Sequence, residues 1–427
     1  MTDVTAAELT AGELRALDAI DRDEILTLLR TLMAVPSISG SDAECDIQDM
    51  LARELRKRGL DVDHWRLDLD TLTAEPDFPG WEVPRTESWG LAARTSDEAV
   101  PALVLQGHVD VVPPGDPRLW AGDPFTPVFD GERLIGRGAC DMKAGVVANL
   151  AAIAAILKSR IVLPRPLGIH CVVGEEDGGL GAYATLARGH RAEACIITEP
   201  TDDTLITANA GALTFELVIE GLSTHGSTAY AGHSAIDAYW HVHHALQELE
   251  GRRNATVDIL MQEYPLAYPI SVGMLRAGDW ASTVPDRLVA QGRIGVALDE
   301  DPADARTDLE QAITAINDPW LRDHPVQVRW SGGQFAPGRV LSGSGLAAAV
   351  GTAHADTHGT PRPRERGAPY GSDLRLYSAA GIPTIHYGPG DVRLAHAPNE
   401  AVRLQQVVRC TQTLAVTALR ASRSIES

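Results

Sequence analysis

Short hydrophobic runs and helical segments alternate along the first half of the chain. Apolar runs of strand length lie at 102–107, 167–174 and 194–198, and an alanine-rich apolar segment occupies 144–157. Runs that are apolar throughout are typical of strands buried on both faces, whereas the longer segment fits a helix. The alternation continues to about residue 208 and predicts an α/β fold, with a mostly parallel sheet that helices cover on both faces.

The pattern changes near Ala210. Polar and apolar residues alternate with a period of two at 213–220, which indicates a half-exposed strand. The periodicity then predicts helices at 234–249 and 304–316 and strands at 270–275, 288–296 and 326–330. The resulting order, β-α-β-β-α-β, is that of a ferredoxin-like unit, a two-layer fold that can stand alone.

The α/β character returns towards the end of the chain. We expect a helix at 342–358, a strand at 381–387 and a closing helix at 400–422, and, at the other end, a helix at 23–59 that a loop at 35–40 interrupts. These segments predict a catalytic domain in two parts, 1–210 and 333–427, with an inserted domain at 211–332.

Composition narrows the classes of partner. The net charge is −21, from 37 basic and 58 acidic residues, which argues against nucleic acid and anionic membranes as partners. The five cysteines form no CxxC pair, and the first residues lack a signal-peptide pattern, so we expect a cytoplasmic protein. The apolar segment at 144–157 is short for a membrane span and fits a buried core helix.

Acidic and imidazole side chains follow the predicted buried strands. Because the carboxyl ends of parallel strands meet at one edge of a sheet, where crevices form, we expect most of these groups to lie close together. The candidate residues are His108, Asp110, Asp141, Glu175, Glu176, Glu199 and His396.

Two imidazoles and several carboxylates can share a pair of divalent cations, which polarise a carbonyl group and activate water. Three carboxylate ligands would carry −3 against +4, so the remaining positive charge favours a developing oxyanion. Neighbouring Glu175 and Glu176 in an extended loop point opposite ways, so one can bind metal while the other moves a proton. Asp110, two residues from His108, can accept a hydrogen bond from the far ring nitrogen and fix the ring.

Five ordered segments resemble the motif series of the M20 metallopeptidase family, which includes acetylornithine deacetylases, succinyl-diaminopimelate desuccinylases, aminoacylases and carboxypeptidases. The segments are Gly107–Asp110, Gly136–Gly145, Gly174–Gly178, Thr198–Thr201 and Ala395–Glu400. The resemblance spans about residues 25–420. It implies a zinc-exopeptidase-like catalytic domain with an inserted ferredoxin-like lid and dimerisation domain.

The resemblance also implies a division of labour among the candidate residues. His108, Asp141 and Glu199 would hold one metal, and Asp141, Glu176 and His396 the other, with Asp141 bridging. Glu175 would be the general base and then the general acid, and the peptide bond after Asp141 would be cis. The metals would be zinc, with cobalt or manganese as alternatives, since all three tolerate mixed histidine and carboxylate ligands.

Residues of the insert and of a later turn complete the implied site. Ser223–Ser227 resembles a segment whose histidine, here His225, crosses a dimer interface and helps to hold the oxyanion. Ser282 and Arg293 resemble residues that present a polar side chain and a clamp for a substrate carboxylate. Gly371 and Ser372 resemble a turn that contacts substrate. A homodimer through the inserted domain would follow.

These inferences predict a metal-dependent amidohydrolase that removes an acetyl, succinyl or formyl group from a small amino-acid-like substrate. Glu199 favours a deacylase, since peptidases of the family often carry Asp at this position. The segments Asp77–Gly80 and Gly278–Ser282 resemble a deacylase branch that includes formylaminopyrimidine deformylases. The alternatives are an exopeptidase or dipeptidase on the same centre and a non-catalytic binding protein.

Overall fold

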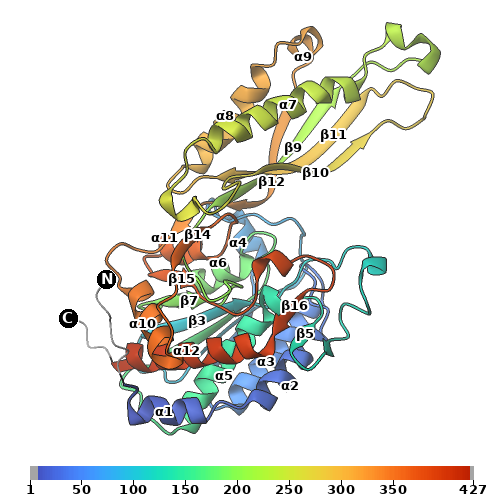
Figure 1. Cartoon of the computed structure of the whole chain (residues 1–427). Coiled ribbons are helices and arrows are strands. Elements are labelled where there is room, and N and C mark those ends of the chain that lie inside the picture. Colours follow the sequence, from blue (N-terminus) through green and yellow to red (C-terminus); the bar gives the residue numbers. More distant parts are fainter. Residues whose placement is uncertain (1–7, 424–427) are drawn as a thin grey trace.

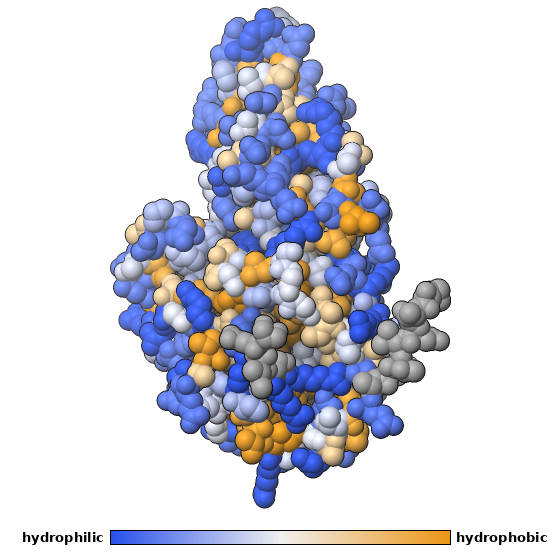
Figure 2. Space-filling view, turned by 90° about the vertical axis from the view of Figure 1, so that its left-hand side faces the viewer, coloured by the Kyte–Doolittle hydropathy of each residue, from blue (hydrophilic) through white to orange (hydrophobic). Residues whose placement is uncertain are grey.

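The computed structural model describes residues 8–423 and contains three sheets. A large α/β body carries the nine-stranded main sheet, and a smaller, elongated part projects from one end of it (Figure 1). The smaller part is formed by residues of the predicted insert. Its surface is largely hydrophilic on the face that Figure 2 shows, with scattered hydrophobic residues.

The main sheet is mixed, with a parallel centre. Its order is β1-β2-β6-β3-β7-β15-β8-β13, and β14 pairs with β8. The central strands β6, β3, β7 and β15 run parallel, whereas β1, β2 and β13 pair antiparallel at the two sides. The strand bounds are β1 Asp61–Arg66, β2 Trp89–Arg94, β3 Leu103–His108, β6 Leu167–Val172, β7 Cys195–Ile197, β8 Leu205–Asn209, β13 Gly338–Arg339, β14 Glu365–Ala368 and β15 Thr384–His386.

Helices cover both faces of this sheet, as predicted. Leu103 and Leu105 of β3 join a core with the helices of one face, whereas Val104 packs with the helices of the other face. The first face carries α1 Ala11–Asp18, α2 Arg22–Met33, α3 Ala43–Lys57, α5 Ala144–Lys158, α10 Leu346–His358 and α12 Leu404–Arg423. The second face carries α4 Leu69–Ala74, α6 Leu180–Ala187 and α11 Leu374–Ala379. Successive side chains of β3 thus point to opposite faces of the sheet and pack into two different apolar cores.

One helical segment, Ala139–Lys158, is long and apolar enough to cross a membrane by composition alone. In its most apolar window 83% of the residues are buried inside the protein, so it serves as a core helix. It contacts α12 and the underside of β3 (Figure 1). This position accounts for its near-uniform hydrophobicity, since it packs against the apolar face of α12 and against a strand that is buried along its whole length.

The smaller part is a four-stranded antiparallel sheet covered on one face by three helices. The sheet order is β10-β11-β9-β12, the order of a ferredoxin-like unit. Apolar residues of β9 and β11 pack under the helices, so the opposite face carries their polar neighbours, among them Thr214 and Arg293. The bounds are β9 Gly211–Glu220, α7 Ala235–Arg253, β10 Ile270–Ala277, β11 Arg287–Val296, α8 Pro302–Thr314, α9 Pro319–Asp323 and β12 Gln327–Phe335.

Several predicted bounds were wrong near glycines and short strands. The closing helix begins at Leu404, because the predicted start pairs instead as β16 with β5. The helix predicted from Ser342 begins at Leu346, since Gly343 and Gly345 adopt positive φ angles. The remaining short elements are β4 Val128–Phe129, β5 Arg133–Ile135, β16 Ala401–Arg403, η1 Pro117–Leu119, η2 Ala139–Lys143, η3 Gly226–Ala231, η4 Ile259–Met261 and η5 Val392–Leu394.

Candidate metal centre

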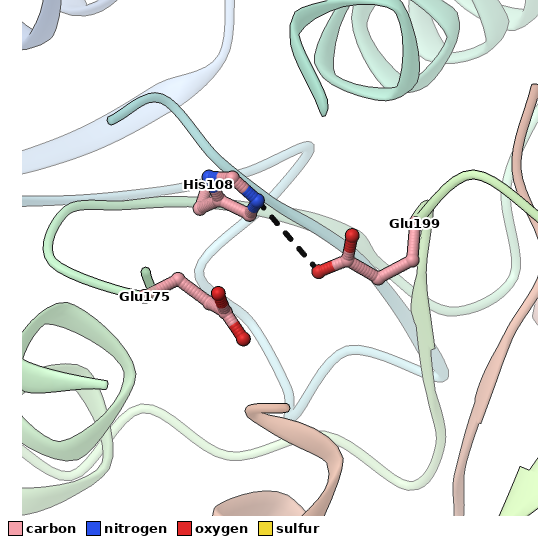
Figure 3. Close-up of side chains that lie close together, drawn as sticks. All are labelled: His108, Glu175 and Glu199. Carbon is pink, nitrogen blue, oxygen red and sulfur yellow. Dashed lines mark ion pairs between the residues drawn. The ribbon is translucent and has the colours of Figure 1, made fainter. Parts of the chain in front are cut away.

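The candidate residues meet at the carboxyl edge of the parallel centre of the main sheet. His108 ends β3, the two neighbouring glutamates follow β6, and Glu199 follows β7. Since β6, β3 and β7 are adjacent, their ends deliver His108, Glu175 and Glu199 to one point (Figure 3). Asp141 comes from η2 at the start of α5, and His396 from the loop after η5.

His108 lies at the centre of the group and is buried. Its Nε2 lies 3.1 Å from Oδ1 of Asp141 and 3.8 Å from Oε1 of Glu199. The dashed line in Figure 3 marks the second contact. Ligand atoms of His108, Glu175 and Glu199 all lie within 4.8 Å of one another, and so do those of His108, Asp141 and Glu176. Both groups contain His108, but its Nδ1 faces the Asp110 carbonyl and its Nε2 can bind only one cation, so the two groups overlap at that atom.

His396 approaches from the open side and is half exposed. Its Nε2 lies 3.0 Å from Oε2 of Glu176 and 3.5 Å from Oδ2 of Asp141. The residue adopts a φ of 61°, in the left-handed region that is uncommon for non-glycine residues. The peptide bond between Asp141 and Met142 is cis. Asp141 thus faces both imidazoles, which is the position that a bridging ligand requires.

Asp110 is buried behind His108. The Nδ1 of His108 lies 3.0 Å from the main-chain carbonyl oxygen of Asp110 and 3.5 Å from its carboxylate. The carboxylate instead accepts hydrogen bonds from the main-chain N–H groups of Glu175 and Glu176, both at 3.2 Å, and from the Ser39 hydroxyl at 3.0 Å. The carbonyl therefore holds the His108 ring, while the carboxylate fixes the turn that carries the two glutamates.

Electrostatics make this cluster unfavourable without added positive charge. Burial raises the pKa of Glu175 well above its ordinary value, and repulsion from Glu199 adds to the rise. Burial also raises the pKa of Glu199, against the attraction of His108, and Asp141 and Glu176 add repulsion. Like charges that share a buried site raise one another's pKa in this way. Four carboxylates face only two imidazoles here.

The donor set fits a pair of divalent cations. Two ions would supply a charge of +4 to balance the four carboxylates, and oxygen and imidazole nitrogen are the donors that zinc, cobalt and manganese accept. The carbonyl behind His108 also supplies the usual acceptor for the ring nitrogen of a metal-binding histidine that does not face the metal. Burial, charge and ligand type therefore all agree with a two-metal centre.

Other predicted site residues lie apart from this cluster within one chain. His225 is exposed at the start of η3, where its Nδ1 accepts a hydrogen bond from the Ser227 main chain at 3.1 Å. Ser282 is exposed in the neighbouring loop, and its carbonyl oxygen accepts a hydrogen bond from Gly226. Arg293 lies on the face of the small sheet opposite the helices.

The turn at residues 371–372 packs tightly. A side chain at Gly371 would overlap Phe335, since a Cβ would lie 2.4 Å from Phe335 Cβ. Ser372 is buried, and its hydroxyl lies 2.9 Å from Nε2 of His386. The Ser372 side chain is thus engaged within the protein, which leaves main-chain groups of the turn for any contact with substrate.

Sequence reasoning assigned no role to two buried groups that hold the site. Glu400 accepts hydrogen bonds from the segment that carries Asp141, and Arg85 binds Asp177, the neighbour of Glu176. Glu400 ends a motif already recognised in the sequence, so its position was available as a signal. Arg85 lies 92 residues from Asp177 and offers no local pattern.

Clustered metal donors at the edge of a parallel sheet are typical of metal-dependent hydrolases. The profile of peptidase family M20/M25/M40 matches residues 104–420. The chain therefore belongs to peptidase family M20/M25/M40, whose members hydrolyse C–N bonds.

Curated relatives match nearly the whole chain. The chain is 27% identical over 419 residues to an N-formyl-4-amino-5-aminomethyl-2-methylpyrimidine deformylase of Bacillus subtilis (strain 168), covering 92% of this chain and 93% of that protein. It is 30% identical over 399 residues to a succinyl-diaminopimelate desuccinylase of Stenotrophomonas maltophilia (strain K279a), covering 90% and 95%. Among solved structures, a di-peptidase from Saccharomyces cerevisiae matches with a TM-score of 0.77 at 16% identity, covering 97% and 99%. At that identity the likeness concerns the fold alone.

Proposed function

We propose that this chain is a two-metal amidohydrolase that removes an N-acyl group of acetyl, succinyl or formyl type from a small amino-acid-like substrate. The observation that carries the proposal is the buried cluster of two imidazoles and four carboxylates at the sheet edge. The deformylase and desuccinylase relatives support a deacylase over a peptidase, since both remove an acyl group from nitrogen. The proposed location is the cytoplasm.

In this proposal His108, Asp141 and Glu199 hold one cation, and Asp141, Glu176 and His396 hold the other. The cations are zinc, or else cobalt or manganese. When bound, such a pair polarises a carbonyl group and makes water a better nucleophile at neutral pH. Asp110 fixes the glutamate turn through its two main-chain hydrogen bonds, so the carboxylates keep their spacing as substrate enters.

Glu175 is the proposed general base and then acid. Within residues 8–423, no group donates a hydrogen bond to its carboxylate, so the oxygens are free to accept a proton from water. Its raised pKa suits a group that takes a proton and later delivers it to the leaving nitrogen. The adjacent Glu176 faces His396 instead, at 3.0 Å, which separates the two roles.

Arg293 is the proposed clamp for a substrate carboxylate. Among the described residues, no hydrogen bond or ion pair reaches its guanidinium, and its Nε atom is buried without a partner. Arg293 is partly buried and Glu82 attracts its guanidinium, but the unpaired buried Nε is costly, and a substrate carboxylate would satisfy the guanidinium with paired hydrogen bonds. Ser282 and the turn at Gly371 and Ser372 are the further proposed contacts with substrate.

Residues 211–332 would act as a lid and dimerisation domain. Large apolar side chains are exposed on its surface, including Tyr230 at 89%, Trp280 at 74% and Trp240 at 57%. The strand β10 also forms an open edge of the small sheet. Exposed apolar groups and an unpaired strand edge each favour association with a second copy. His225 would then reach the metal centre of the other subunit.

A substrate screen on protein of measured metal content tests the proposal. N-acetyl, N-succinyl and N-formyl amino acids are compared with dipeptides at equal concentration, before and after removal of metal by a chelator. We expect faster turnover of an N-acyl amino acid, lost on chelation and restored by zinc, cobalt or manganese. Faster dipeptide cleavage would replace the deacylase with the dipeptidase, and metal binding without turnover of any substrate would favour a binding protein.

The role of Glu175 is tested by Glu175→Gln. The neutral amide keeps the shape but cannot accept a proton, so kcat should fall by about 10²–10⁴-fold. The metal content should stay near that of the wild type. The exposed Glu193→Gln is the matched control and should leave both unchanged. If Glu175→Gln turned over substrate at the wild-type rate with metal bound, proton transfer would have to come from another group.

A further inference from the structure

The buried carboxylate of Glu400 binds the segment that leads to Asp141. Its Oε2 accepts hydrogen bonds from Nη1 of Arg137 at 2.7 Å and from the main-chain N–H of Gly138 at 3.1 Å. Its Oε1 accepts from the main-chain N–H groups of Cys140 at 2.8 Å and Asp141 at 3.1 Å. All four donors lie on residues 137–141, so one side chain fixes the backbone from which the Asp141 carboxylate projects.

Arg137 extends this contact to the other side of the centre. Its Nη2 donates to the carbonyl oxygens of His396, at 3.2 Å, and Pro113, at 3.4 Å. Its guanidinium also lies 5.3 Å from the Trp120 ring, which covers it. The pair of Arg137 and Glu400 therefore touches the main chain of two proposed ligands, Asp141 and His396. Those ligands come from segments about 255 residues apart in the sequence.

Both ligands need such support. His396 adopts a positive φ of 61°, which a non-glycine residue holds only when its surroundings determine it. Its Nε2 lies 3.5 Å from Oδ2 of Asp141, and small shifts of either main chain would change that spacing. Groups behind metal ligands orient them, and their loss typically costs about 10–100-fold in metal affinity.

We propose that Glu400 and Arg137 act as a positioning pair that sets the spacing of Asp141 and His396 for a shared metal. This inference rests on the proposed metal centre. It differs from a purely structural role, because the loss of the pair should weaken metal binding beyond what the loss of stability alone explains. Neither residue touches substrate in this proposal.

Glu400→Gln tests whether the hydrogen bonds that the Glu400 carboxylate accepts influence metal binding. The amide keeps the volume of the carboxylate, but one oxygen becomes an NH₂ group, which cannot accept a hydrogen bond. Two of the four donors then face a donor. The control is Glu300→Gln in the small part of the molecule, where Glu300 binds Arg253 at 2.5 and 2.8 Å in a similar fork. Arg137→Lys is the second variant, since a single ammonium cannot serve Glu400 and the His396 carbonyl with the same geometry.

The experiment titrates Co²⁺ into metal-free full-length protein and follows the visible absorption of bound Co²⁺, with a competing chelator to give the affinity of each site. Thermal unfolding of the metal-free proteins is measured alongside. We expect Glu400→Gln to weaken one of two sites by about 10–100-fold and to change the absorption spectrum. Arg137→Lys should act in the same direction. The control should match the wild type in both titration and spectrum.

Wild-type affinity and spectrum in both Glu400→Gln and Arg137→Lys would overturn the positioning role. So would a metal-binding loss that Glu300→Gln reproduces at equal destabilisation. If Glu400→Gln fails to fold, Arg137→Lys decides by the same two readouts. Failure of the underlying function is distinct, because the wild-type protein itself would then bind no Co²⁺.

Discussion

Substitution of Arg85 tests how the fold holds the turn that carries Glu175 and Glu176. It lies in the connection between α4 and β2, and its guanidinium binds two carboxylates from separate parts of the chain. Nε and Nη2 donate to Glu44 of α3 at 2.8 and 2.9 Å, and Nη1 and Nη2 donate to Asp177 at 2.9 and 3.0 Å. We predict that Arg85→Met destabilises the protein strongly and disturbs the adjacent Glu175 and Glu176.

The magnitude follows from burial. The side chains of Arg85, Glu44 and Asp177 are exposed by only 1%, 2% and 5%. Methionine fills a similar volume but leaves two buried carboxylates without a counter-charge. Removing one partner of a buried ion pair costs about 3–5 kcal/mol, far more than the net contribution of an exposed pair. We therefore expect the free energy of unfolding to fall by about 3–5 kcal/mol at pH 8.

The loss should depend on pH in a defined direction. Burial raises the pKa of Glu44 from 4.5 to about 7, against the attraction of Arg85. Without Arg85 this pKa rises further. The folded state then binds more protons than the unfolded state at any pH between 4.5 and the raised value, so stability decreases as pH rises through that window. Because the wild-type Glu44 also stays protonated up to about pH 7, the deficit of Arg85→Met should be nearly the same at pH 5 and 6.5 and larger at pH 8.

Urea unfolding of metal-free protein at about pH 5, 6.5 and 8 measures the deficit. The matched control is Arg253→Met, which breaks a comparable fork with Glu300 far from the metal centre. Both variants should lose stability, but only Arg85→Met should also lower metal content and kcat. A loss below 1 kcal/mol at pH 8, or a deficit that grows as the pH falls, would refute the reasoning.

Three further predictions concern substrate, assembly and acid stability. Arg293→Ala should raise KM for an N-acyl amino acid by about thirtyfold, or 2 kcal/mol, yet hardly affect the same substrate with its carboxylate amidated; steady-state kinetics on both compounds decides. Trp240→Glu should convert the proposed dimer to a monomer, as measured by sedimentation velocity, and lower kcat. His225→Ala should lower kcat while the dimer stays intact. A wild-type kcat in a monomeric Trp240→Glu protein would contradict an active site that needs His225 from the second subunit. Burial lowers the pKa of His170 to about 3, so the unfolded chain binds a proton that the folded one does not, and stability falls as pH drops from about 6.5 towards 3. His170→Gln should remove about 1.4 kcal/mol per pH unit of that loss between pH 6 and 4, as urea unfolding of metal-free protein would show.

Periodicity predicted the layout of the fold because burial dominates these elements. The run at 102–107 is apolar on both sides, since Leu103 and Leu105 enter one core and Val104 the other. The outer strands were harder to place. The strand β1 has intermediate or exposed residues along its whole length, so its antiparallel pairing with β2 depends on tertiary contacts that no local pattern carries. The β16 segment likewise becomes a strand only because β5 pairs with it.

The grouping of the candidate residues was predictable for a different reason. His108 ends a strand of the parallel centre and Glu175 and Glu199 follow two others, and topology brings the ends of parallel strands together. Asp141 and His396 lie outside that rule, and only the motif series connected them with the site. At Asp110 the main-chain carbonyl lies nearer to Nδ1 of His108 than the carboxylate does, and the carboxylate also binds the turn of Glu175 and Glu176; no local sequence pattern indicates this arrangement.

The buried charged residues behind the metal centre share a feature that no local sequence pattern shows. Two of the proposed metal-binding segments are held from behind by a buried charge from a distant part of the chain: Arg85 holds the turn of Glu175 and Glu176 through Asp177, and Glu400 holds the Asp141 segment. A buried charge is tolerated only when its hydrogen bonds are complete, so each of these residues fixes its segment in one conformation. Cations then bind donors that are already placed, although like-charged carboxylates in contact would otherwise separate. Arg85 and Glu400 therefore keep the ligand carboxylates close together in spite of their mutual repulsion, which bound cations would reduce. For this reason we expect the removal of either residue to weaken metal binding as well as stability.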